Sequence, residues 1–191
     1  MVQELTANRI GGRAIGALFF TGFGAIWLLV GLYAKERLST TPVSLVACGT
    51  AALASGAFFL LRRAKELPRM PEDPAIMRVF KRINIIQWTA VAVVAIAFAH
   101  FGLSAYVASA ITAIVGLHMF PLARLFRYPQ HHLTGAALVG WAAASVLLFP
   151  KDEMQGPTAL GTGAILWLSA LVTLALATRG VRSPVKANST Q

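Results

Sequence analysis

The sequence predicts an all-α integral membrane protein, a bundle of six transmembrane helices with both termini in the cytoplasm. Of its 191 residues, 57% are hydrophobic and only 13% are charged, whereas a soluble domain carries about 25% charged residues. None of the 17 basic and 7 acidic residues falls within six long apolar runs. The basic residues gather on every second connection between these runs, which sets the orientation of the chain.

The six apolar runs have the length of transmembrane helices. Each is 17 to 20 residues long, close to the ~20 residues with which a helix crosses about 30 Å of hydrocarbon. Strands of a membrane barrel would be about half as long and would alternate apolar with polar residues. We therefore expect one membrane domain over residues 1–178, followed by a disordered cytoplasmic tail over 179–191. The expected spans are residues 15–33, 43–61, 83–101, 104–122, 133–149 and 159–178.

The first run is expected to be a retained signal anchor. A cleaved signal peptide has a shorter apolar region and a small-x-small site after it. The residues that follow this run, Tyr33-Ala34-Lys35-Glu36, contain no such site.

Lysine and arginine predict the orientation. Fourteen lie before the first run, after the second, after the fourth or after the last, and only Lys35, Arg37 and Lys151 lie on the other side. Cytoplasmic connections are the ones enriched in these residues. We therefore expect a protein of a bacterial-type inner membrane with both termini in the cytoplasm. Tyr33 and Tyr106 then fall at the outer interface and Tyr128 at the inner one, where tyrosine is enriched.

The connection over residues 62–82 holds seven of the basic residues. Asp73 before Pro74 is typical of a helix N-cap followed by proline at the first helical position. Arg78, Lys81 and Arg82 then fit either an interfacial helix that binds anionic lipid headgroups or ordinary anchoring on the cytoplasmic side. Nucleic acid is excluded as a partner, because the basic residues flank apolar runs instead of lining one soluble face.

Small residues predict where helices meet, because they let backbones approach closely in lipid. The third and fourth spans are separated only by Gly102-Leu103 and should form a tight hairpin. The pattern fits a compact bundle or a homo-oligomer. Small residues recur at helical spacing in four sets: Gly12 and Gly16; Thr89, Ala92, Ala95 and Ala99; Ala105, Ala108, Thr112 and Gly116; Gly140 and Ala144. Residues 21–28 also echo residues 162–168, so an inverted repeat is conceivable.

The segment from His118 to His132 is the densest polar cluster. His118 and Gln87 lie at one predicted depth on neighbouring spans, and polar groups inside a membrane are candidates for function. We therefore treat His118 and Gln87 as a possible ligand-binding pair. The alternative is that His118 is an interfacial histidine that reaches water.

Two further hypotheses concern the same segment. Arg124 and Arg127 fit either capture of an anionic ligand or anchoring at the inner boundary. A metal bound by His118, His131 and His132 is a weaker alternative, because no carboxylate or thiol lies near in sequence to complete the shell. No cofactor is predicted.

The expected function is passage or binding of a small or apolar molecule within the helix bundle. The spans carry no Asp or Glu, and the chain has neither a His-Glu-x-x-His motif nor a phosphate-binding glycine loop. These absences argue against an enzyme. An accessory or scaffold subunit with a partner in the membrane is the alternative, and a metal- or haem-linked membrane enzyme is the third.

Overall fold

The chain forms six long helices and no strand in the part that the structure describes. The computed structural model describes residues 7–68 and 73–182, the last four by their backbone alone. The elements are α1 (Ala7–Ala34), α2 (Thr40–Ala64), α3 (Pro74–His100), the short 3₁₀ helix η1 (Ser104–Tyr106), α4 (Val107–Leu125), α5 (Gln130–Leu148) and α6 (Gln155–Arg182). All six long helices are long and apolar enough to cross a membrane, which confirms the prediction of an all-helical fold with six candidate spans.

Most helices extend beyond the expected spans. α1 begins at Ala7 instead of residue 15, and α3 runs from Pro74 through the basic segment into the apolar run as one helix of 27 residues. α6 continues to Arg182, past residue 179 where the tail was expected to begin, and residues 183–191 lie outside the described residues. Hydrogen bonds within a helix satisfy its backbone groups in any surroundings. A helix can therefore continue beyond its apolar run into the polar interface.

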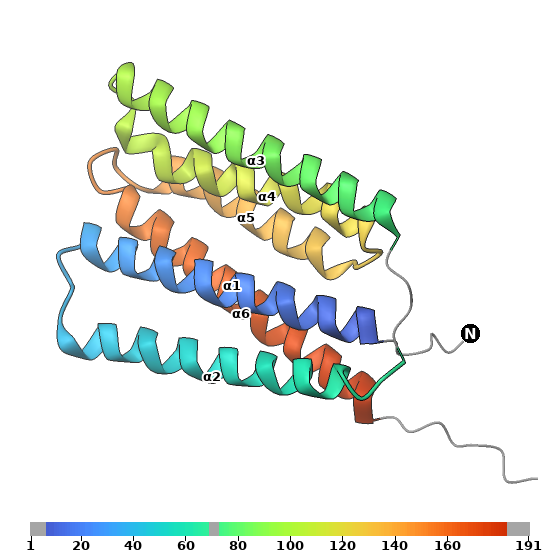
Figure 1. Ribbon diagram of the computed structural model, residues 1–191. Coiled ribbons are helices and arrows are strands. Elements are labelled where there is room, and N and C mark those ends of the chain that lie inside the picture. The colour runs from blue at the N-terminus through green and yellow to red at the C-terminus, as the bar shows by residue number, and fades with distance from the viewer. Residues whose placement is uncertain (1–6, 69–72, 183–191) are drawn as a thin grey trace, which may run out of the picture.

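The helices form two groups of three (Figure 1). In one, α1 packs against α2 and α6; in the other, α4 packs against α3 and α5. The groups meet where α6 contacts α4 and α5. The start of α1, the end of α6 and the α2–α3 and α4–α5 connections share one end of the bundle, which we name the terminal end. The other three connections lie at the opposite end.

Glycines let α1 and α6 cross at close range. A Cβ atom placed on Gly163 would lie 2.8 Å from the carbonyl oxygen of Gly24, and one on Gly24 would lie 3.1 Å from that of Gly163. The indole nitrogen of Trp167 also donates a hydrogen bond to the Thr21 carbonyl at 3.1 Å. The echo between residues 21–28 and 162–168 therefore lies at the crossing of the two helices that carry it.

A second glycine crossing joins α4 and α5. A Cβ on Gly116 would lie 2.9 Å from the Gly135 carbonyl oxygen, and one on Gly135 would lie 2.7 Å from that of Gly116. The small face expected on the fourth span thus packs inside the bundle, with Ala108, Thr112 and Gly116 all buried. The 102–103 hairpin is also present, with Gly102 in the left-handed region at φ +70°.

Among the described residues, most members of the other small-residue sets are exposed or have no close neighbour. α3 buries none of its side chains, and Thr89, Ala92 and Ala99 are exposed. A Cβ on Gly12, Gly16 or Gly140 would meet no atom within 4 Å. Large apolar side chains are exposed as well, such as Ile86 at 69% and Leu147 at 83%, which suits surroundings of lipid.

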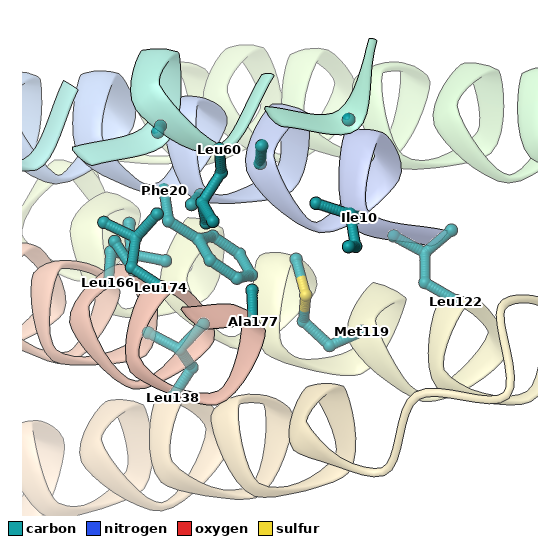
Figure 2. Close-up of a cluster of buried hydrophobic side chains, with 14 residues drawn as sticks. Ile10, Phe20, Leu60, Met119, Leu122, Leu138, Leu166, Leu174 and Ala177 are labelled. Carbon is teal, nitrogen blue, oxygen red and sulfur yellow. The ribbon is translucent and has the colours of Figure 1, made fainter. Parts of the chain in front are cut away.

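The core lies between the two groups (Figure 2). Side chains from five of the helices fill it, and each is at most 8% exposed. Labelled members are Ile10, Phe20, Leu60, Met119, Leu122, Leu138, Leu166, Leu174 and Ala177. This packing fixes the helices that carry the polar groups described next.

Candidate functional site

The turn between α4 and α5 directs a tyrosine into the bundle. α4 passes through Pro121 without ending and stops at Leu125. Arg127 then adopts the left-handed region at φ +50°, and the Tyr128 amide donates to the Ala123 carbonyl at 3.0 Å. Glycine usually occupies this left-handed position, so arginine there costs about 1 kcal/mol. The reversal buries Tyr128, which was expected at the membrane interface, to 9% exposure.

A series of edge-to-face ring contacts runs from this turn toward the core. The rings of Tyr128 and His131 meet edge to face at 5.0 Å between centres, and those of His131 and Phe20 do so at 5.7 Å. The guanidinium carbon of Arg13, on α1, lies 4.9 Å from the centre of the Tyr128 ring. Arg13 and Phe20 are seven residues apart and thus share a face of α1. This series of contacts therefore joins α1 to the start of α5 at the terminal end.

Three polar atoms in this region are buried without a hydrogen-bond partner among the described residues. They are His118 Nε2, Tyr128 OH and His131 Nδ1. The other ring nitrogen of His118 lies 3.3 Å from the Val115 carbonyl oxygen. His118 lies on α4, which packs against α5, the helix that carries His131. We name Arg13, His118, Tyr128 and His131 the polar cluster.

Leaving these atoms unpaired is costly. A buried polar group without a partner costs about 1–3 kcal/mol in proteins. The polar cluster holds three such atoms. Each such group in a stable fold calls for an explanation such as a bound water or ligand. The polar cluster is therefore the candidate site.

Buried hydroxyl groups continue from the cluster into the bundle along α6. The Thr134 hydroxyl donates to Ser169 at 2.9 Å, joining α5 to α6. Thr173, one turn from Ser169 toward the terminal end, has a buried hydroxyl with no partner in the described part of the chain. By helical register it lies at the depth of the first turn of α5, which contains His131.

An apolar layer separates this region from a second pair of hydroxyls. Leu138 and Leu166 lie one turn beyond Thr134 and Ser169 and are at most 2% exposed. Beyond them, the hydroxyls of Thr112 and Thr162 lie 2.8 Å apart between α4 and α6. Buried hydroxyl groups thus lie on both sides of the layer that Leu138 and Leu166 form.

The expected pair of His118 and Gln87 is not joined by a hydrogen bond. Gln87 is half-buried on α3. His118 Nδ1 lies against the Val115 carbonyl oxygen and Nε2 has no described partner, so neither nitrogen bonds to Gln87. Sequence position predicts how deep a residue lies along its helix, but the rotation of each helix about its axis decides which side chains meet. The sequence reasoning grouped His118 with His131 and His132, but it missed Tyr128, whose ring contacts His131.

The remaining predicted residues are distributed around the terminal end. Arg124 and Arg127 are exposed, as are Arg78, Lys81 and Arg82. The N-cap is confirmed, since the Asp73 carboxylate accepts a hydrogen bond from the Ala75 amide at 2.8 Å and Pro74 begins α3. His132 packs against the Phe120 ring, 5.7 Å between centres.

The metal alternative gains no geometric support. Within the described ranges, no three His, Cys, Asp or Glu side chains are placed to hold a metal ion. His118, His131 and His132 therefore do not form a three-ligand site in this arrangement.

A cleft of about 710 Å³ lies at the opposite end, between the end of α1, η1 and the α5–α6 connection. Several of its polar groups have partners: Lys35 pairs with Glu153 at 3.5 Å, and Gln155 donates to the Ser104 carbonyl at 2.9 Å. Lys151 lies 5.8 Å from the centre of the Tyr106 ring. The described lining of the cleft contains no buried polar atom without a partner, in contrast to the polar cluster.

No protein-family model, curated protein or solved structure matches the chain.

Proposed function

We propose that the protein is a multi-spanning membrane protein that binds a small molecule at the polar cluster. One observation carries the proposal: Tyr128, His131 and His118 present buried polar atoms that no described protein group satisfies. A bound molecule with hydrogen-bonding groups would recover the free energy that these atoms lose. The cluster adjoins the terminal end, so the molecule arrives from that side.

Binding fits the packing better than open passage. Leu138 and Leu166 fill the layer between the two depths of hydroxyl groups, and a molecule could pass only if they moved. We also propose that the protein is not an enzyme, because its six spans contain no Asp or Glu to act as acid or base.

The charge distribution supports a cytoplasmic terminal end in a bacterial-type inner membrane. By sequence position, fourteen of the seventeen basic residues and four of the seven acidic residues belong to this end. The opposite end carries three of each, so the whole net charge of +10 belongs to the terminal end. This asymmetry follows the rule for cytoplasmic connections and favours contact with anionic lipids.

Mass spectrometry of copurified molecules tests the proposal. Protein extracted in mild detergent should carry a small molecule that is absent, or reduced at least tenfold, in His118→Leu and His131→Phe. Thr162→Val is the matched control, because it removes a buried hydroxyl from the other depth. Equal content in all four proteins would refute binding at the cluster.

A second candidate function rests on α3. This helix buries none of its side chains and exposes Thr89, Ala92 and Ala99 on one side. Such a surface suits close contact with another transmembrane helix, as in an accessory subunit or a homo-oligomer. Ala92→Leu should then lower the oligomeric mass measured in detergent, and an unchanged mass would remove this candidate.

A further inference from the structure

We infer that the molecule bound at the polar cluster carries an anionic group, a phosphate or a carboxylate, and that Arg13 recognises it. The inference rests on the proposed function and adds the chemical class of the ligand. Three observations carry it: the charge of Arg13, the donors around it and the orientation of α5.

Arg13 brings a permanent positive charge to the cluster, and no carboxylate of the described residues pairs with it. It is half-buried on α1, inside a helix apolar enough to span the membrane. Ion pairs in the described residues join Lys35 to Glu153 and Arg63 to Glu66, so neither involves Arg13. Its described contact is the face of the Tyr128 ring, which leaves the edges of the guanidinium for other acceptors. A guanidinium binds phosphate or carboxylate through two parallel hydrogen bonds.

The neighbouring groups favour negative charge as well. A tyrosine hydroxyl and an imidazole N–H can donate hydrogen bonds to an anion, and the Tyr128 hydroxyl and His131 Nδ1 are buried without a partner among the described residues. α5 begins at Gln130, beside the cluster, with no side-chain cap on its N-terminus. The positive end of its dipole therefore lies next to the cluster.

Two sources could supply the anion. The phosphate of a lipid headgroup could reach the cluster from the adjacent leaflet, and a free phosphate or carboxylate could reach it from water. Both present the same chemistry to Arg13.

The test measures thermal unfolding of the full chain in neutral detergent, with inorganic phosphate added at constant ionic strength. A parallel series uses nanodiscs of phosphatidylcholine with or without phosphatidylglycerol. We expect wild type to gain about 4 °C at tenfold excess over Kd. A gain with phosphate identifies a free anion, and a gain with phosphatidylglycerol alone identifies a headgroup.

Variants assign the effect to Arg13. Arg13→Gln should lose the gain, whereas Arg124→Gln, which removes an exposed charge at the same end, should keep it. Arg13→Lys should keep part of it, because it retains the charge but loses the paired geometry. If Arg13→Gln does not fold, loss of most of the gain in Arg13→Lys supports the inference and an undiminished gain overturns it.

Either of two other results overturns the inference: no gain in wild type, or equal gains in Arg13→Gln and Arg124→Gln. The proposed function can survive this failure. A neutral molecule that copurifies with Arg13→Gln but not with His131→Phe would show binding at the cluster without an anion.

Discussion

The guanidinium of Arg13 lies over the ring of Tyr128, 4.9 Å from its centre, where α1 meets the turn between α4 and α5. Tyr128 reaches this place only because Arg127 reverses the chain in the left-handed region. The contact brings a permanent charge next to buried hydrogen-bonding groups that lack partners. The following predictions test the packing that supports this arrangement and then the site.

The hydroxyl pair between α4 and α6 should stabilise the fold. Thr112 and Thr162 lie 2.8 Å apart, and such bonds between membrane helices contribute about 0.6 kcal/mol, with a maximum near 1.7. Thr162→Val should lower the free energy of unfolding by about 1 kcal/mol. A double-mutant cycle with Thr112→Val should show coupling, whereas fully additive losses would show that the pair contributes nothing.

The α4–α5 crossing should reject a methyl group. In Gly116→Ala the new Cβ would lie 2.8 Å from Val139 Cγ2 and 2.9 Å from the Gly135 carbonyl oxygen. Overpacking of this kind costs about 1–3 kcal/mol. Gly140→Ala is the control, because a Cβ atom at this position meets nothing within 4 Å. This substitution should stabilise α5 by about 0.5–1 kcal/mol. Equal effects in thermal unfolding would argue against the close crossing.

The end of α1 should gain stability from glycine. Glu36 has φ +53°, and the following Arg37 amide donates to the Leu32 carbonyl at 2.8 Å. Glu36→Gly removes the left-handed strain and should raise the free energy of unfolding by about 1 kcal/mol. Arg37→Gly, at a position without positive φ, should bring no gain. A loss of stability in Glu36→Gly would contradict this account of the turn.

Topology can be tested with single cysteines in a Cys48→Ala background. Lys65 and Asp152 are exposed on connections at the two ends of the bundle. In intact cells, a membrane-impermeant maleimide should label Asp152→Cys, and it should label Lys65→Cys only after permeabilisation. The reverse pattern would invert the orientation, and labelling of both from one side would rule out six spans.

The sequence was sufficient for the number and kind of helices. Long apolar runs without charge predict spans because hydrocarbon excludes both charge and unbonded backbone. The same reasoning misplaced helix ends, since α1 and α3 continue through segments that contain Arg13 and Arg78. Apolar length measures the hydrocarbon core, whereas a helix ends where its capping groups allow.

Helix contacts were harder to predict than spans. Gly116 was singled out, but its partner Gly135 was not, and Gly12 and Gly140 were singled out although neither lies at a close crossing. A small residue permits close approach, yet only the arrangement of helices decides which small residues meet. That arrangement depends on packing around side chains such as Phe20 and Leu138.

The candidate site was predicted only in part. His118 was chosen for its depth, and it does have a buried nitrogen without a partner in the described chain. Tyr128 was assigned to the interface because nothing in the sequence indicates that Arg127 adopts positive φ. The spacing of Tyr128 and His131 by three residues was an available signal, since such residues meet at the start of a helix.

The most direct test of the central claim is the effect of Tyr128→Phe on the free energy of unfolding, measured with and without the copurified molecule. Without it, the variant should match or exceed wild type, because the lost hydroxyl is buried and has no partner. With it, the variant should be less stable than wild type by about 1 kcal/mol, the contribution of one hydrogen bond to the ligand. The same difference under both conditions would show that no molecule binds at the polar cluster through Tyr128, and would contradict the account.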